Sequence, residues 1–132
     1  MNLIIDTSVI IAVLTSEPER AGLVESTRGA TLIAPASVHW EVGNALAAMF
    51  KRRRIDRRQI RQVLKSYELI PIRYVDVPLE EALELAAERG LYAYDAYVLA
   101  CAVSQRCKLV SLDKGLIRAA GEVGVGVVEV SE

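Results

Sequence analysis

Four acidic residues stand at positions where a carboxyl group needs a physical explanation. Asp6 and Asp113 each follow a short apolar run, "NLII" and "KLVSL". Asp95 sits in the most apolar helical segment of the chain, and Glu41 interrupts an apolar stripe that runs from Val38 to Met49. A carboxylate buried without a partner costs several kcal/mol, so these four residues are the candidates for chemistry.

Each of the four also has an ordinary structural explanation when it is taken alone. Asp6, Asp95 and Asp113 stand near predicted helix starts, where a carboxylate can cap free backbone N–H groups. An inward Glu41 could reach solvent or pair with an arginine. These alternatives stay open for each residue, and the combination of all four is what points to a site.

The elements that must position these residues alternate along the chain. Strands are predicted at 2–6, 30–35, 71–77, 108–112 and 124–130. Helices are predicted at 7–17, 18–29, 36–53, 56–70, 78–90, 93–107 and 114–122, with Thr7 or Ser8 capping the first and Asp56 the fourth. This alternation is typical of an α/β fold, in which a mostly parallel sheet has helices on both faces. We expect residues 1–132 to form one domain.

The predicted strands and helices can bring the four acids together. Asp6 and Asp113 would leave the carboxyl ends of parallel strands, the edge at which open α/β sheets bind ligands. Glu41 and Asp95 would project from helices that can cover this edge. If the four carboxylates converge, their repulsion requires protonation or a cation. An oxygen-rich cluster without histidine or cysteine favours a hard cation, Mg²⁺ or Mn²⁺.

Composition and charge narrow the class of protein. A chain of 132 residues that is 52% hydrophobic is not disordered. Cys101 and Cys107 are too few for a disulfide framework, which favours a reduced, cytoplasmic protein. No apolar run approaches the roughly 18 residues of a membrane span, and Met1 is not followed by a basic leader, so no membrane association is expected.

The basic residues are concentrated in one segment, although the net charge is only −1. "KRRRIDRRQIR" (51–61) contains seven basic residues against Asp56 alone. A solvated helix end would explain such a run, and so would a surface that contacts phosphates. The strongest candidates for such contacts are Arg52, Arg53, Arg54, Arg57 and Arg58.

Four segments that occur in order along the chain carry a family resemblance. They are "LIIDTSV" (3–9), "EVGNAL" (41–46), "YDAYVLA" (94–100) and "LVSLDKGL" (109–116). Together they resemble the signature segments of PIN-domain nucleases, and the short chain is similar in size to the VapC-type toxins of toxin–antitoxin pairs. The resemblance implies a three-layer αβα sandwich with a sheet of about five strands. It also implies an endoribonuclease that depends on Mg²⁺ or Mn²⁺.

The same resemblance implies roles for the four acids. Asp6, Asp95 and Asp113 would be metal ligands, with Asp6 and Asp95 closest to the ion. Glu41 would bind metal or orient the attacking water. Hydrolysis by a metal-activated water would leave a 5′-phosphate and a 3′-hydroxyl.

Several neighbouring residues complete this prediction. Ser8 and Ser111 match hydroxyl residues that line the site, and Asn44, one helical turn from Glu41, is a candidate partner for the carboxylates. Leu116 stands where many family members carry an aromatic residue. This difference leaves open whether the site holds one metal ion or two. His39, the one histidine, is interpreted as structural.

The resemblance also implies partners. They are an RNA substrate, a VapB-type antitoxin and a second copy of the chain in a homodimer. The arginines of segment 51–61 could contact RNA or an acidic antitoxin segment. Tyr92, Tyr94 and Tyr97 could stack on unpaired bases, although packing in the core or in an interface is the stronger expectation for at least two of them.

Other functions fit the sequence less well. A non-catalytic PIN-type module that binds RNA or protein usually lacks part of the acidic set, and this chain has all four acids. A phospho-acceptor signalling module needs an acceptor aspartate on a middle strand and a later lysine; here only Asp76 is near such a place. A phosphatase of the haloacid-dehalogenase type would need aspartate at position 8, where this chain has Ser8.

Overall fold

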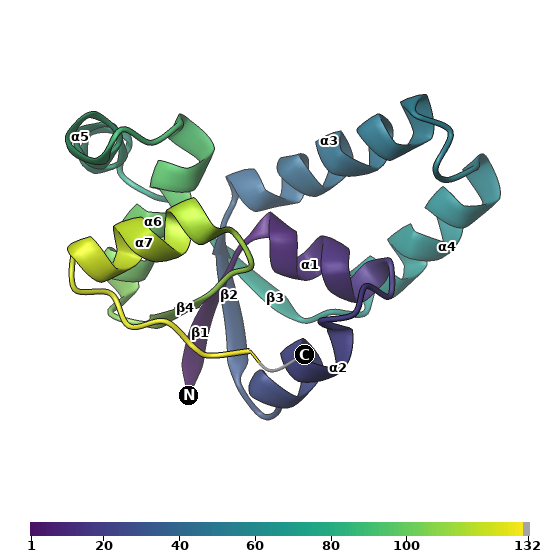
Figure 1. The fold of residues 1–132 in the computed structure, drawn as a ribbon, viewed down its shortest axis with the longest axis horizontal. Helices are drawn as coiled ribbons and strands as arrows, with labels where there is room; N and C mark the ends of the chain where they lie inside the picture. The colour runs from purple at the N-terminus through teal and green to yellow at the C-terminus, as the bar shows by residue number, and fades with distance from the viewer. Residues whose placement is uncertain (131–132) are drawn as a thin grey trace.

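Four parallel strands form the centre of the computed structural model, which describes residues 1–130 (Figure 1). The strands are β1 (Asn2–Ile5), β2 (Thr31–Pro35), β3 (Ile72–Val75) and β4 (Lys108–Val110). The helices are α1 (Thr7–Leu14), α2 (Arg20–Ser26), α3 (Ser37–Lys51), α4 (Arg57–Glu68), α5 (Leu79–Arg89), α6 (Ala93–Gln105) and α7 (Lys114–Glu122). The strand order is β3-β2-β1-β4, so β1 and β2 lie in the middle of the sheet.

Helices cover both faces of the sheet. The chain steps from β1 to β2 to β3 in one direction and then returns to β4, so right-handed crossovers place α1–α4 on one face and α5 and α6 on the other. The packing agrees with this rule, because α1 contacts α2, α3 and α4, whereas α5 contacts α6. The predicted α/β architecture with three layers is confirmed.

The sheet has one strand fewer than the sequence predicted. Segment 124–130 is not a strand; it meets β4 at one isolated bridge, between Leu109 and Val127. Two backbone hydrogen bonds of 2.9 Å, from Leu109 N to Gly126 O and from Val128 N to Leu109 O, hold it there. Gly124, at φ +78°, lies outside the extended region of the backbone, so the segment can become extended only after this residue.

The core lies between the sheet and the inner faces of its helices. β1 is buried along Leu3, Ile4 and Ile5, as expected for a strand covered on both faces. Helix α6 is the most buried helix, with Ala96 and every residue from Val98 to Ala102 inside. The acidic residue in this helix therefore sits against an apolar wall.

Local signals end most helices where the sequence predicted. Asp56 caps α4 in a reciprocal capping box with Gln59, and Gly90 ends α5 in the left-handed conformation at φ +64°. Of the three residues predicted as possible caps of α1, Asp6 is the cap, and Thr7 and Ser8 are not. No helix in the described part of the chain is long and apolar enough to cross a bilayer.

Helices α3 and α4 form an antiparallel arm that extends away from the sheet (Figure 1). The base of the arm is held by an aromatic cluster. His39 Nδ1 and the Tyr67 hydroxyl are 2.8 Å apart, and the Tyr67 hydroxyl also bonds the Tyr74 hydroxyl on β3. The rings of His39 and Tyr67 stack at 5.7 Å. His39 thus joins α3 to α4, as its structural interpretation predicted.

Candidate active site

Asp6 stands at the carboxyl end of β1 and is 6% exposed. Its Oδ1 accepts hydrogen bonds from Ser8 Oγ (2.6 Å) and Val9 N (3.2 Å), and its Oδ2 accepts one from Ser111 Oγ (2.5 Å). Burial raises the pKa of Asp6, while the bonds from Ser111, Ser8 and the Val9 backbone oppose that rise. Asp6 is therefore a helix cap whose side chain is held in place, and its hydrogen bonds offset part of the cost of burying its charge.

The two predicted serines tie Asp6 to the loop after β4. Ser8 Oγ accepts a hydrogen bond from Leu112 N, and Ser111 Oγ accepts one from Asp113 N, each at 3.0 Å. Asp113 Oδ1 in turn accepts from Leu116 N at 3.0 Å and caps α7. The capping alternative is thus confirmed for both strand-end acids, and the network holds their side chains at one edge of the sheet.

Glu41 faces this edge from α3, beside the buried stripe of Val38, Val42 and Leu46. Its residue is half-buried, and its Oε1 is buried without a hydrogen-bond partner among the described residues. Burial, with added repulsion from Asp95 and Asp6, raises the pKa of Glu41 to about 7. The sequence missed Thr7, whose hydroxyl lies near Glu41 and favours its charged form.

Asp95 lies in the first turn of α6, where the helix dipole favours a negative charge. It is not the cap, because that position belongs to Tyr92. Burial raises the pKa of Asp95, and repulsion from Asp113 and then Asp6 raises it further. Neither Asp95 nor the other three acids forms an ion pair among residues 1–130; the ion pairs found there join Arg28 to Glu25 and Arg89 to Glu122.

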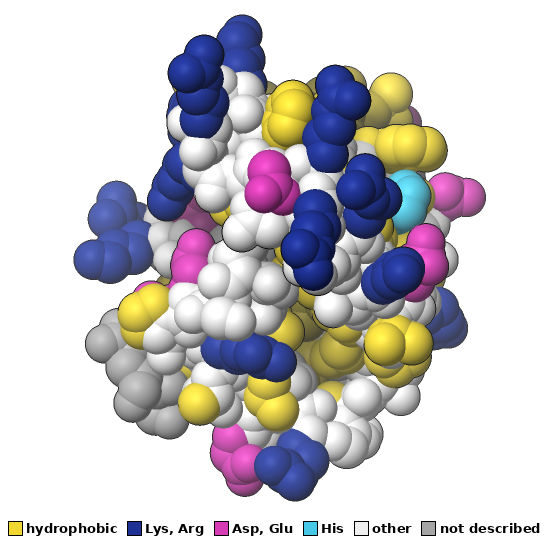
Figure 2. Space-filling model, turned by 90° about the vertical axis from the view of Figure 1, so that its right-hand side faces the viewer, with side chains coloured by type: hydrophobic (Ala, Val, Ile, Leu, Met, Phe, Trp, Pro, Cys, Tyr) yellow, Lys and Arg dark blue, Asp and Glu magenta, His cyan; other side chains and the backbone are white. Residues whose placement is uncertain are grey.

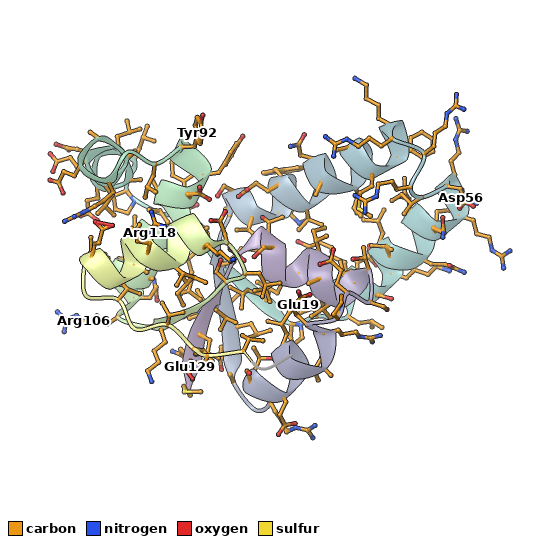
Figure 3. The ribbon with its side chains drawn as sticks, in the orientation of Figure 1. Glu19, Asp56, Tyr92, Arg106, Arg118 and Glu129 are labelled. Carbon is orange, nitrogen blue, oxygen red and sulfur yellow. The ribbon has the colours of Figure 1, made fainter. Side chains whose placement is uncertain are left out.

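The four acids form one electrostatic cluster, which we call the acidic pocket: Asp6, Glu41, Asp95 and Asp113. Each repels at least one of the others, and oxygen atoms gather where α6 and α7 face the starts of α1 and α3 (Figure 3). Within the described residues, no three side chains already stand in a metal-holding arrangement.

The residues of the pocket nevertheless fit a divalent cation. The donor set consists only of carboxylate oxygens, which suits Mg²⁺ or Mn²⁺. The buried Oε1 of Glu41 has no partner in the described chain, and a buried polar atom of this kind requires a ligand or water. Asp6, Asp95 and Asp113 could supply the remaining oxygens.

Other predicted site residues lie elsewhere. Asn44 is exposed, and no hydrogen bond among the described residues joins it to the carboxylates. The predicted RNA-binding arginines lie at the far end of the α3–α4 arm, which we call the basic tip: Arg52, Arg53, Arg54, Arg57 and Arg58. The first of them follows Glu41 by eleven residues, or about 16 Å of helix. Figure 2 shows many basic side chains spread over this side of the molecule.

Tyrosines border the acidic pocket at the start of α6. Tyr92 is 88% and Tyr94 is 55% exposed, so neither packs in the core of this chain. Tyr97 is half-buried and meets Tyr94 edge to face, with the ring centres 5.9 Å apart. Of the three tyrosines, Tyr97 packs partly in the core, as expected for at least some of them, whereas Tyr92 and Tyr94 do not.

The fold and the acidic pocket define an α/β protein with a carboxylate site at its strand ends, and comparison with known proteins identifies its class. The PIN domain family matches residues 3–122. The chain therefore belongs to the PIN domain family, as the resemblance predicted.

One relative by sequence is named exonuclease VapC9, from Pyrobaculum aerophilum. It is 37% identical to this chain over 82 residues. The match covers 59% of this chain and 59% of the relative, so it spans less than two thirds of that protein.

Solved structures share the fold. PAE2754 from Pyrobaculum aerophilum is 26% identical with a TM-score of 0.70, over 90% of this chain and 87% of its own. VapC20 from Mycobacterium tuberculosis, described as a Sarcin-Ricin loop cleaving toxin, is 16% identical with a TM-score of 0.67, over 98% and 99% of the two chains. VapBC2 from Rickettsia felis, bound to a promoter DNA fragment, is 13% identical with a TM-score of 0.66, over 99% and 100%. The last two show the fold alone.

Proposed function

We propose that the protein is a metal-dependent endoribonuclease and the VapC-like toxin of a toxin–antitoxin pair. The acidic pocket is the observation that carries this proposal. It collects four carboxyl groups at the sheet edge that binds ligands, and burial raises the pKa of three of them without any basic partner in the described chain. The family and the VapC names of its relatives support the proposal.

Asp6, Asp95 and Asp113 would hold Mg²⁺ or Mn²⁺. When bound, such an ion supplies activation of water and neutralisation of charge on the phosphodiester. Asp6 is prepared for this role, because hydrogen bonds from Ser8 and Ser111 fix both of its oxygens before any ligand arrives. No side-chain hydrogen bond of Asp95 is found within residues 1–130, so its carboxylate could turn toward a cation.

Glu41 would orient the attacking water and accept its proton. In the metal-free protein the pKa of Glu41 is about 7, and a proton acceptor is most effective when its pKa lies near the working pH. A bound cation would lower this pKa and favour the charged form, which accepts protons. The unpaired, buried Oε1 is available for a hydrogen bond from water. Hydrolysis by water would leave a 5′-phosphate and a 3′-hydroxyl.

The RNA would reach the acidic pocket with help from positive charge elsewhere. All five arginines of the basic tip are exposed and free to contact phosphates, although they do not surround the pocket. Tyr92 and Tyr94 are exposed beside the pocket, where aromatic rings can stack on unpaired bases.

Partners follow from the same proposal. A VapB-type antitoxin would cover the pocket, and relatives solved as toxin–antitoxin complexes support this assignment. A homodimer and a cytoplasmic location remain part of the proposal. The alternative is a non-catalytic PIN-type module that binds RNA or protein.

One experiment separates these possibilities. The purified protein is incubated with total RNA and Mg²⁺ or Mn²⁺, beside samples with EDTA, the Asp95→Asn variant and the exposed control Glu84→Gln. Discrete cleavage with 5′-phosphate ends, kept by the control and abolished by EDTA and Asp95→Asn, supports the nuclease. Cleavage that survives Asp95→Asn indicates a contaminant. Absence of both cleavage and Mn²⁺ binding favours the non-catalytic module.

A further inference from the structure

A small hollow lies over the ends of β2 and β3, at the edge of the sheet that also carries the acidic pocket. Its volume is about 190 Å³, and its walls include Pro35, Ser37, Val75, Asp76, Leu79 and Tyr97. Pockets for drug-sized ligands begin at roughly 300 Å³, so this hollow suits one flat ring system and not a whole nucleotide. A hydrogen bond of 2.9 Å from Ala36 N to Val75 O joins two of the residues that line it.

The sheet register gives the distance from the hollow to the acidic pocket. The pairing of Ile4 with Ile33 places Pro35 level with Asp6 on the neighbouring strand, and Pro35 pairs with Val75 on the next. Adjacent strands lie about 4.8 Å apart, so the hollow begins about 5 Å and ends about 10 Å from Asp6 along the edge. A base held there belongs to a nucleotide next to the phosphodiester at the pocket.

The walls of the hollow suit a nucleobase. The half-buried ring of Tyr97, held edge to face against Tyr94, offers a surface for stacking. Leu79 is 58% exposed and supplies an apolar wall. Asp76 is exposed and takes part in no ion pair among residues 1–130, so its carboxylate is free to accept hydrogen bonds.

The carboxylate decides which base fits. Its two oxygens can accept hydrogen bonds from two parallel N–H groups, and an ionised carboxylate donates no hydrogen bond. Among the four RNA bases, guanine alone carries two adjacent N–H donors, N1–H and the N2 amino group, on its pairing edge. Adenine, cytosine and uracil each place an acceptor beside their donor, and that acceptor would face the negative charge.

We propose that this hollow holds a guanine base of the substrate, read by Asp76 and stacked on Tyr97, beside the cleaved phosphodiester. The proposal rests on the proposed nuclease function and adds a base preference to it. Asp76 has no part in the acidic pocket, so removing its charge alters selection and leaves the chemistry in place.

The test uses short RNAs that contain one guanine at a fixed position in an otherwise uridine-rich strand. We expect wild-type protein to cut at a constant spacing from the guanine and to lose at least about tenfold in kcat/KM when adenine replaces it. Inosine lacks the N2 amino group and should lose a large part of the preference. Asp76→Asn should reduce the guanine-to-adenine ratio about tenfold and still cleave, whereas the exposed control Glu80→Gln should keep it. An unchanged ratio in Asp76→Asn overturns the proposal.

A second measurement separates failure of the hollow from failure of the nuclease. Binding of guanosine and adenosine monophosphate to metal-free protein is followed by NMR shifts of the Tyr97 ring. Preferential binding of the guanine nucleotide, lost in Asp76→Asn, supports the hollow even if no RNA is cut. Equal binding of both nucleotides, or a preference that persists in Asp76→Asn, overturns the proposal even if the nuclease is active.

Discussion

Helix α3 connects the acidic pocket, to which it contributes Glu41, with the basic tip, which begins at Arg52 directly after the helix ends. The charges of the two regions stand in opposite physical situations. Near the start of the helix, Glu41 lies beside buried apolar residues and its pKa rises to about 7. Near the end, Lys51 and Arg52 are exposed to solvent. A solvated charge needs no compensation, whereas a half-buried charge does. The comparison shows that the burial of its charged side chains, and not their number, distinguishes the region where we propose the chemistry.

The two regions also differ in how firmly they are held. Side-chain hydrogen bonds from Ser8 and Ser111 fix Asp6 in the pocket. At the tip, the capping box of Asp56 and Gln59 orders the turn of the backbone, and no side-chain hydrogen bond of the tip arginines is found within residues 1–130. We therefore propose that bond breaking takes place at the pocket and that the tip binds phosphates loosely.

The largest expected effect comes from removing the proton acceptor in the pocket. Glu41→Gln should lower the rate of RNA cleavage more than about 100-fold, because the amide cannot accept the proton of water. The matched control is Asn44→Ala, one turn along the same helix at an exposed position, and it should stay within about twofold. Single-turnover cleavage measures both. Equal losses in the two variants would contradict the assignment and restore the predicted role of Asn44.

Neutralising the basic tip should weaken substrate binding and spare the chemical step. Replacing Arg52, Arg53 and Arg57 with glutamine should raise KM about tenfold at moderate salt with kcat unchanged. The slope of log affinity against log salt should fall by about 2, since each phosphate contact on a single strand contributes about 0.7. The control replaces three exposed arginines outside the tip: Arg20, Arg28 and Arg106. An equal change in the control would show that net charge alone matters.

The stability of the metal-free protein should depend on pH through Glu41. The pKa of Glu41 is raised from 4.5 to about 7 in the folded protein, so between these values the unfolded chain releases its proton first. The free energy of unfolding therefore falls as pH rises from about 4.5 to 7 and then levels. For this half-exposed group we expect about 1 kcal/mol after solvent screening. Urea titrations at pH 5 and pH 8 should show a smaller difference in Glu41→Gln, and an identical pH dependence in that variant would contradict the shift.

The smallest expected effect is confined to the tip. Asp56→Ala removes the cap of α4 and should cost about 1 kcal/mol of unfolding free energy. Hydrogen exchange should quicken most in the first turn of α4, whereas the buried amides of α6, which exchange on global unfolding, should quicken by no more than the roughly fivefold that 1 kcal/mol allows. A larger increase in α6 would show that pocket and tip are not independent.

The sequence predicted what depends on local patterns and left out what depends on packing. The cap of α4 at Asp56 and the end of α5 at Gly90 were predicted from neighbouring residues, and both are confirmed, whereas the reciprocal bond from Gln59 was not predicted. The C-terminal segment was predicted wrongly, because its apolar alternation does not reveal the left-handed backbone at Gly124 or the single bridge by which the segment meets β4. The arrangement of strand ends and covering helices followed from the α/β alternation alone.

Details of the site depend on contacts between distant segments. Thr7 was predicted only as a cap, because its place near Glu41 depends on the packing of α1 against α3. Asn44 has the right spacing from Glu41 but is exposed, and helical spacing alone cannot tell which neighbour reaches the pocket. The arginines of segment 51–61 were recognised from composition, while their distance from the acids follows only from the length of α3.

The aromatic cluster at the base of the α3–α4 arm has a mechanical consequence. His39 and Tyr67 join α3 to α4, and the Tyr67 hydroxyl joins the arm to Tyr74 on β3, while α1 supports both helices of the arm. A small rotation of α3 about this base would move the far end of the 15-residue helix, which is about 22 Å long, by several ångströms. The position of the tip arginines therefore depends in part on three side chains at the opposite end of the arm.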